Sequence, residues 1–399
     1  MYAKCHETQK NNTLDMKMTA INYHSKKRNL RRTGKESLYF LRSTITKIFF
    51  VSLFSWFAFY TYKNIYEYFL RREIMGIKSS RMANSSSLTI HENNLSNALL
   101  GAIVADCATM PLHWIYDGNK LNESIVNEDK TACEFNAVPS CPFYSTKEFP
   151  GHYQVGQPSP YGEQLIGTYQ LIQEIKANGK SLNGNAYAEG FKKWLSTYGG
   201  RKDSVSKAFE EKYEAGETYP NCGIDDDQAM SLYKAVIAFH EASSANNELE
   251  LELFVRFLQN NEMALASSQV LLHFLTATAA APKDPLRNTF DLIKSKAPLI
   301  LRDHLAFLDR NLHLGTRDFL VAWGEEFRPG AAYYVPISCH NPQALLRILH
   351  ICLTVSSFEE GVRTNILVGG DNASTAVGIG AVLGNRYGVP NGWIDKSIF

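Results

Sequence analysis

The amino-acid sequence predicts an all-α fold, and three observations support this prediction. Apolar residues recur every three or four positions through most of the chain after residue 93, which is the spacing of one helix face. The strict alternation typical of a half-buried strand is scarce. Hydrophobic residues make up 45% of the 399 residues, enough for a large core and too many for a disordered or collagen-like chain. We expect one helical domain over residues 93–399, without internal repeats.

The helices are predicted in chain order from local signals. An apolar stripe that ends before Pro111 predicts the first helix. A second helix is expected after a loop at residues 159–162, and a third after the acidic residues 225–227. Residues 344–355 are apolar on nearly every side, so that helix is expected at the centre of the core. The last strong helix, at about residues 374–384, carries small residues on one side, which lets a neighbouring backbone approach closely.

The N-terminal part of the chain differs from the rest in charge. Residues 1–82 hold 16 lysines and arginines against 5 aspartates and glutamates, whereas residues 83–399 hold 25 against 35. We divide this part into a basic polar extension at residues 1–47, an apolar segment at 48–62 and a linker at 63–92 that contains runs of serine. The helical domain that follows is acidic, so it repels phosphate backbones and nucleic acid is not an expected partner.

The apolar segment at residues 48–62 leaves two interpretations open. A membrane-spanning helix needs about 20 apolar residues, and this segment has 15, although aromatic ends and flanking lysines can extend a short span. The segment is either a membrane anchor or an amphipathic surface helix. The seven cysteines lack C-x-x-C pairs and are typical of a reducing compartment, although the spacing of Cys133 and Cys141 allows a disulfide. We expect a cytoplasmic protein, associated with a membrane if the segment is an anchor.

Common catalytic motifs are absent from the sequence. It contains no G-x-x-x-x-G-K-[ST], G-x-S-x-G, H-E-x-x-H or C-x-x-C, so P-loop, nucleophile-elbow, zincin and zinc-ribbon chemistry lack support. Asp225, Asp226 and Asp227 are adjacent carboxylates, which repel one another unless a cation or a helix N-terminus compensates. They predict either a cation site or a helix N-cap with an acidic first turn.

Two further places can carry chemistry. Gly369 and Gly370 precede Asp371 at the start of the last strong helix, and such a turn can present a carboxylate to a hard cation in a cleft. The alternative is that Asp371 is an N-cap. Glu163 follows the rigid loop before the second helix, where it belongs either to a site or only to the first turn, as a partner of the helix dipole.

These residues together resemble the ADP-ribosylglycohydrolase family. Residues 97–106 (NALLGAIVAD) with Met110 and Pro111 resemble its opening G-x-x-x-G-D-A-L-G-x-P. Residues 357–363 (SFEEGVR) and 369–376 (GGDNASTA) resemble the signature that contains G-G-D-T-D-T/S, and residues 259–264 (QNNEMA) resemble T-H-N-x-x-x-A. The three motifs occur in family order over residues 93–395, and details such as MPLHW and SPYGEQ resemble the branch that contains J-type crystallins and selenoprotein J.

The resemblance implies an all-α fold whose cleft holds two Mg²⁺ ions and binds ADP-ribose, with the ions positioning the ribose and an attacking water. This sequence departs from the pattern at several positions. The family acidic residue after G-x-P corresponds to His113, and T-D-D-T corresponds to residues 160–163, which keeps one carboxylate, Glu163. In the second signature Asp371 is kept, but Ala373 replaces the second aspartate. A weak or single Mg²⁺ site is therefore expected.

The resemblance assigns roles to the residues of the matched motifs, and the acidic triplet, which has no counterpart in the family pattern, is an additional candidate. Asp371 and Glu163 are the candidate catalytic residues. The candidate metal ligands are these two carboxylates with the acidic triplet, Asp225, Asp226 and Asp227, if the triplet folds into the same cleft. The candidate ligand-binding residues come from the matched motifs: Gly369, Gly370, Asn372, Ser374, Asn260, Asn261 and His113.

Two functions are open at the level of sequence. The first is an ADP-ribosylglycohydrolase-like hydrolase or ligand-binding protein that acts on ADP-ribosyl or related ribosyl adducts, with a depleted Mg²⁺ site and weak or altered activity. The second is a non-catalytic, crystallin-like structural or binding protein of the same fold. The retained carboxylates favour the first function, whereas Gly162 and Ala373 favour the second. Fold alone does not decide between them.

Overall fold

The structure, a computed structural model, describes residues 90–399 except for 142–148, 150–151, 242–246 and 331–336. Within this part the chain is helical and forms isolated backbone bridges but no β-strand. The all-α prediction is confirmed. The predicted extension and apolar segment, and the linker up to residue 89, lie outside the described residues, so the boundaries at residues 47 and 62 and the anchor interpretation stay predictions.

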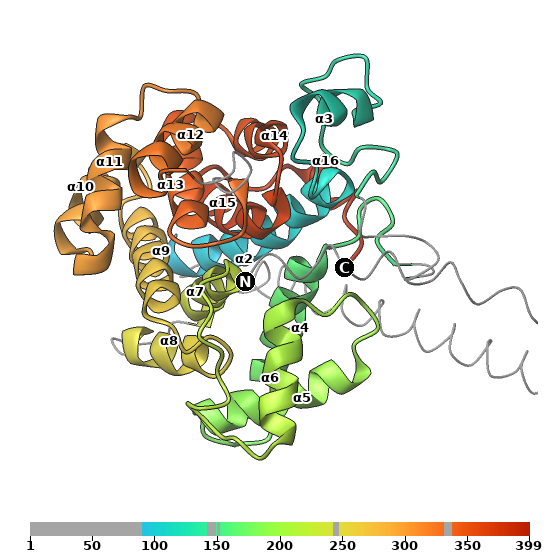
Figure 1. The fold of residues 1–399 in the computed structure, drawn as a ribbon, viewed down its shortest axis with the longest axis vertical. Helices are drawn as coiled ribbons and strands as arrows, with labels where there is room; N and C mark the ends of the chain where they lie inside the picture. The colour runs from blue at the N-terminus through green and yellow to red at the C-terminus, as the bar shows by residue number, and fades with distance from the viewer. Residues whose placement is uncertain (1–89, 142–148, 150–151, 242–246, 331–336) are drawn as a thin grey trace, which may run out of the picture. The chain divides into compact units, whose positions relative to one another are not determined.

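The helices follow one another as Figure 1 shows, and most are joined by short connections. Their bounds are α2 Ile90–Thr109, η2 Met110–Leu112, α3 Gly118–Ser124, α4 Pro160–Ala177, α5 Gly184–Thr197, α6 Ser204–Glu214, α7 Met230–Glu241, α8 Asn247–Arg256, α9 Glu262–Ala280, α10 Leu286–Lys296, η3 Leu299–Leu301, α11 Arg302–Arg310, α12 Thr316–Phe327, α13 Gln343–Thr354, α14 Phe358–Val368, α15 Asn372–Tyr387 and α16 Asn391–Ile394.

Helices α2 and α15 form the most extensive helix pair in the described part of the chain. Glycines allow this close approach: a Cβ on Gly101 would overlap the carbonyl oxygen of Gly380, and a Cβ on Gly380 would overlap that of Gly101. Gly384 packs against α2 in the same way, whereas Gly378 faces Ile348 of α13. The predicted close approach of α15 to a neighbouring backbone is therefore confirmed, and it brings the two ends of the domain together.

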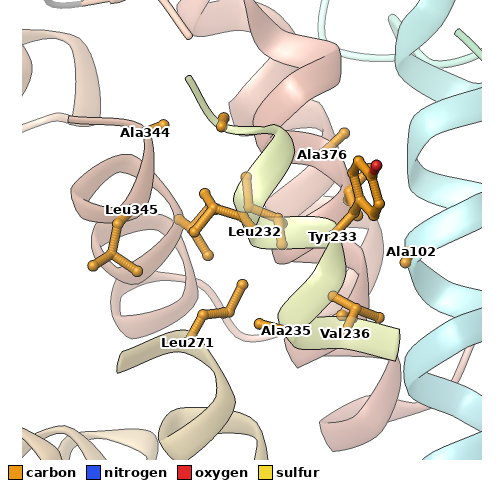
Figure 2. Close-up of a cluster of buried hydrophobic side chains, with 14 of the residues drawn as sticks. Ala102, Leu232, Tyr233, Ala235, Val236, Leu271, Ala344, Leu345 and Ala376 are labelled. Atoms are coloured by element: carbon orange, nitrogen blue, oxygen red, sulfur yellow. The ribbon is translucent and has the colours of Figure 1, made fainter. Parts of the chain in front are cut away.

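Helices α7 and α13 lie in the core. Figure 2 shows Leu232 and Val236 of α7 among apolar side chains of α2, α9, α13 and α15. The residues of α13 from Gln343 to Cys352 are all buried, as the sequence predicted. Cys133 and Cys141 are buried free thiols, so the disulfide that their spacing allows is not formed.

The start of α4 differs from the prediction, whereas the start of α7 agrees with it. Helix α4 begins at Pro160 rather than after residue 162, because the Ser159 hydroxyl accepts a hydrogen bond from the Tyr161 backbone N–H (3.1 Å) and proline suits the first helical position. Helix α7 begins at Met230, so Asp225, Asp226 and Asp227 precede it in a turn.

One helix in the described part of the chain, α9, is long and apolar enough to cross a membrane by length and composition. Most of its apolar residues are buried, and α9 packs extensively against α7. A core helix of a globular domain meets the same criteria, so α9 is accounted for by the fold.

Helix α7 carries a buried lysine in the apolar core. Lys234 is 0% exposed, and its Nζ donates one long hydrogen bond to the Val255 carbonyl (3.4 Å) and lies 4.8 Å from the centre of the Phe257 ring. Burial lowers the pKa of Lys234 well below its usual value, and the Asp203 charge opposes this shift only in part. The lysine therefore lowers the stability of the folded domain.

We expect Lys234→Met to raise the melting temperature at pH 7 by an amount that corresponds to about 1–3 kcal/mol, because it removes a poorly satisfied buried donor. The unfolded lysine keeps its proton up to about pH 10.5 whereas the folded one does not, so wild-type stability rises with pH in this range and the gain should shrink near pH 10. Thermal melts at both pH values measure this difference. Lys207→Met, at an exposed position of α6, is the control, and an equal gain in both variants would contradict the prediction.

Candidate functional site

The site begins at the turn between α14 and α15. Gly369 and Gly370 both have left-handed backbone angles, with φ of 77° and 69°, which favour glycine. The N–H of Gly370 donates to the Ile115 carbonyl (2.8 Å), and the N–H of Asp371 donates to the Ile337 carbonyl (2.9 Å). Side chains at either glycine would collide with these same carbonyl groups. The glycines therefore let the turn pass between two backbone segments and fix the position of Asp371.

Asp371 is 2% exposed, and its carboxylate points at aromatic donors. Its Oδ2 accepts hydrogen bonds from Trp114 Nε1 (2.8 Å) and the Tyr161 hydroxyl (3.0 Å), while its Oδ1 lies 3.5 Å from His113 Nε2. The side chain makes no capping hydrogen bond to α15. Asp371 therefore occupies the N-cap position of α15 without capping it: its carboxylate instead bridges the start of α15 to α4 and to the segment after η2.

His113 is also completely buried beside Asp371. Its Nδ1 lies 3.0 Å from Asn372 Oδ1 and 3.1 Å from the Ala373 backbone nitrogen, which fixes the ring against the start of α15. Burial lowers the pKa of His113 to about 4, although the Asp371 charge acts in the opposite direction. The imidazole is therefore neutral at physiological pH.

Arg347 of α13 places a positive charge next to the turn between α14 and α15. It is 1% exposed, and its guanidinium donates to the carbonyls of Gly369 (3.0 Å) and Asn365 (2.6 Å). Burial lowers the pKa of Arg347 to about 9, and the Asp371 charge counteracts this shift. Arg347 thus stays protonated at neutral pH and places a positive charge near the Asp371 carboxylate.

Glu163 lies in a second cluster on α4. Its Oε2 accepts hydrogen bonds from the hydroxyls of Tyr198 (2.5 Å) and Tyr153 (3.3 Å), and its Oε1 lies 3.6 Å from His152 Nε2. The side chain is 18% exposed. Burial raises the pKa of Glu163 to about 7 despite the two hydrogen bonds, and the nearby Asp106 charge adds to the rise. Glu163 can therefore hold or release a proton near neutral pH.

Arg201 and Trp114 connect the two clusters. The backbone N–H of Arg201 donates to the Tyr153 hydroxyl (2.7 Å), and its guanidinium lies over the Trp114 ring, 4.5 Å from the centroid. Trp114 in turn donates to Asp371. An unbroken series of contacts therefore runs from the Glu163 carboxyl to the Asp371 carboxylate.

A pH-dependent gain in stability is expected for Glu163→Gln. Folding raises the pKa of Glu163 from 4.5 to about 7, so the folded protein keeps a proton that the unfolded chain releases in this range. The contribution of Glu163 to stability is complete below pH 4.5 and is lost as the pH rises to about 7. Glutamine does not ionise, so its advantage over glutamate should be about 3 kcal/mol larger at pH 8 than at pH 5.

Thermal melts of wild type and Glu163→Gln at pH 5 and pH 8 measure this difference. Glu174→Gln is the matched control, because Glu174 lies on the same helix, is 53% exposed and pairs with Lys193. The control should change stability equally at both pH values. An advantage of Glu163→Gln that does not grow with pH would mean that Glu163 ionises as an ordinary surface residue does.

Each residue of the acidic triplet has its own protein partner. Asp225 Oδ1 accepts from Asn261 Nδ2 (2.7 Å), and the Asp226 carboxylate accepts from the backbone N–H (2.8 Å) and side-chain amide (3.0 Å) of Gln228. Asp227 Oδ1 lies 2.5 Å from His340 Nδ1, and this contact raises the pKa of the histidine. The three carboxylates thus stabilise the turn before α7, and their interpretation as an N-cap with an acidic first turn is wrong.

Cys339 lies between this turn and the Asp371 carboxylate. Its Sγ contacts Gln228 Oε1 (3.5 Å), and burial raises the pKa of its thiol well above the usual value, with a further contribution from the Asp371 charge. The triplet is therefore a neighbour of the site, across Gln228 and Cys339, rather than a direct partner of Asp371.

The remaining predicted ligand-binding residues divide into two groups. Asn372 and Ser374 belong to the turn itself: Asn372 Nδ2 donates to the Leu112 carbonyl (3.2 Å), and the Ser374 hydroxyl donates to the Asp371 carbonyl (2.9 Å). Asn260 and Asn261 have structural partners elsewhere. Asn260 Oδ1 accepts from Arg256 (2.9 Å), and Asn261 Oδ1 caps α9 through the Ala264 N–H (3.0 Å). Whether any of these residues contacts a ligand stays a prediction.

Sequence reasoning missed four members of the site: Trp114, Tyr161, Arg201 and Cys339. Trp114 and Tyr161 stand inside the matched motifs but carry no charge, so neither resembles a metal ligand or a catalytic acid. Cys339 lies in residues 338–342 (SCHNP), which resemble the crystallin branch but gave no role to the thiol, and Arg201 lies in a segment to which no motif was assigned. Only the folded chain brings these side chains to Asp371 and Glu163.

The described residues provide no set of ligands suited to the predicted Mg²⁺ ion. Across the described ranges, no group of three or more His, Cys, Asp or Glu side chains is placed to hold a metal ion. The groups that the structure places on Asp371 Oδ2 are hydrogen-bond donors, which do not coordinate a cation. The residues present therefore do not fit a Mg²⁺ site of the kind that the resemblance implies.

Comparison with known proteins agrees with the resemblance found in the sequence. The family model described as ADP-ribosylglycohydrolase matches residues 88–397. Crystallin J1A and Crystallin J1B of Tripedalia cystophora are each 25% identical to this chain, over 322 and 324 residues, which cover 75% of this chain and 90% and 91% of theirs. A solved structure described as an ADP-ribosylglycohydrolase-related protein complex matches with a TM-score of 0.49 and 15% identity, over 78% of this chain and 94% of that one.

Proposed function

The chain belongs to the ADP-ribosylglycohydrolase family, and from that premise we propose that it binds an ADP-ribosyl or related ribosyl ligand beside Asp371 and hydrolyses it with weak or altered activity. The observation that carries the proposal is the Asp371 carboxylate, 2% exposed, fixed by Trp114 and Tyr161 and not used to cap α15. Burying a carboxylate lowers stability unless its charge is well compensated, so a rigid, oriented carboxylate is more typical of a site than of a scaffold.

The chemistry would use two carboxyl groups in different surroundings. The Asp371 carboxylate is held by Trp114 and Tyr161, and a fixed anion stabilises the positive charge that develops at an anomeric carbon during glycosidic cleavage. Glu163, with a pKa of about 7, can donate a proton to the leaving group near neutral pH. Arg201, stacked on Trp114, places a cation between them that suits a phosphate or a ribose hydroxyl.

The second candidate function is a non-catalytic, crystallin-like role. Its support is the similarity to Crystallin J1A and J1B, together with the substitutions at Gly162 and Ala373. In this case the Asp371 cluster would be a buried hydrogen-bond network that specifies the packing of α4 against α15. Such a network needs no ligand.

A melting experiment with ADP-ribose, combined with hydrolysis assays, separates the two functions. A ligand that binds only the native state raises stability by RT ln(1+[L]/Kd), so the proposal expects a saturable shift. Release of ADP-ribose from arginine-linked and serine-linked substrates should be detectable and slow. AMP and free ribose serve as fragment controls. If ADP-ribose shifts nothing and all rates equal the uncatalysed ones, the crystallin-like function is the correct one.

A further inference from the structure

We propose that the Asp371 site excludes divalent cations, because the chain's own Trp114 indole and Tyr161 hydroxyl donate to the carboxylate and the nearby Arg347 guanidinium supplies the positive charge that an ion would supply. The proposal concerns metal binding alone, so it stands or falls independently of the function proposed above. It would make ligand binding at this site independent of Mg²⁺, unlike the expectation from the family resemblance.

The hydrogen bonds that the Asp371 carboxylate accepts leave no place for an ion. A bound Mg²⁺ needs oxygen lone pairs at about 2.0–2.1 Å in octahedral arrangement. Asp371 Oδ2 instead receives two hydrogens, from Trp114 Nε1 at 2.8 Å and from the Tyr161 hydroxyl at 3.0 Å. Neither group can turn a lone pair toward an ion while it donates. The other oxygen, Oδ1, faces the neutral ring of buried His113.

The charge of the Asp371 carboxylate is already balanced by a buried arginine. Arg347 is a cation at neutral pH, 1% exposed, and its guanidinium donates to the carbonyl of Gly369 two residues before Asp371. It already offsets the single negative charge of the carboxylate. A divalent ion at the same carboxylate would be repelled by Arg347 at low local dielectric, where charges interact strongly. The other carboxylates that could counter it, those of the acidic triplet, are bound to Asn261, Gln228 and His340.

The positions from which further metal ligands would have to reach the ion are filled by packed atoms. Gly162 stands at an aspartate position of the T-D-D-T motif, and a Cβ there would overlap the carboxylate of Asp106. Asp106 is itself 0% exposed and held by the backbone N–H (2.7 Å) and hydroxyl (2.6 Å) of Ser159. Ala373, at the aspartate lost from the second signature, is 0% exposed, with its N–H against His113. Neighbouring atoms fill the space at both positions, so the fold leaves no room there for the lost carboxylate ligands.

The test uses the full chain and the metal alone. Mn²⁺ is paramagnetic and broadens the NMR signals of nearby protons, and the Trp114 indole N–H touches Asp371 directly. The chain has five tryptophans, so the Trp114 signal is assigned by comparison with Trp114→Phe. We expect this signal to persist at stoichiometric Mn²⁺, and millimolar Mg²⁺ to leave the melting temperature unchanged. An ion that binds without broadening the Trp114 signal supports the proposal, because it lies elsewhere.

Selective loss of the Trp114 signal at stoichiometric Mn²⁺ would overturn the proposal. A calorimetric titration provides a second readout: micromolar Mg²⁺ binding that disappears in Asp371→Asn but not in Asp226→Asn would overturn it as well. The NMR experiment does not depend on whether Asp371→Asn folds. Failure of the ADP-ribose experiment would leave both of these outcomes unaffected, so the two proposals are tested separately.

Discussion

Gly101→Ala is expected to destabilise the domain by about 3 kcal/mol or more, which is at the upper end of the range for overpacked cores. The added methyl group would overlap the carbonyl oxygen of Gly380 and approach the Cα of Gly384 to 3.0 Å. Both neighbours are backbone atoms of α15, so no side chain can rotate away. The two helices must separate, and the separation would disturb the largest helix pair in the described part of the chain.

Chemical denaturation of wild type and Gly101→Ala measures this loss. The matched control is Gly392→Ala in α16, where an added Cβ meets nothing within 4 Å. In the control the alanine should be neutral or raise stability by up to about 1 kcal/mol, because it restricts the unfolded chain. Equal stability of Gly101→Ala and wild type would show that α2 and α15 lie farther apart than described.

The fold could be predicted from the sequence because its signals are local. Apolar spacing and small residues predicted the helices, the central position of α13 and the close approach of a neighbour to α15. The predicted start of α4 was wrong because capping chemistry decides it. Ser159 and Pro160 start α4 earlier than the loop-like composition suggested, and the triplet before Met230 binds side chains instead of capping α7.

The site could be predicted only as far as its backbone motif. The two glycines before Asp371 correctly indicated a special turn, since their left-handed conformations follow from local chain geometry. The direction of the carboxylate could not be predicted, because Trp114 and Tyr161 reach it from positions 257 and 210 residues earlier in the chain. Pairings of this range depend on how α2, α4 and α15 pack, and no periodicity encodes them.

Asp371→Asn is expected to abolish the response to ADP-ribose and to reduce hydrolysis by about 100-fold or more, as the loss of a preorganised electrostatic group does. Asparagine keeps the volume but removes the charge: its carbonyl oxygen can still accept from Trp114 and Tyr161, but an NH2 donor then replaces the oxygen that faces His113. Arg347 would also lose the carboxylate that favours its protonated form, so some loss of stability should accompany the functional loss.

The melting temperature of Asp371→Asn alone does not distinguish a catalytic site from a structural network, because the carboxylate is buried in both cases and caps no helix. The decisive quantity is the shift that ADP-ribose produces in each variant. Asp318→Asn, at an exposed position of α12, makes the same chemical change without touching the cluster and should keep the wild-type shift and rate. If Asp371→Asn is folded and retains both, the carboxylate contributes only to packing, and the ligand site must be sought away from the α14–α15 turn.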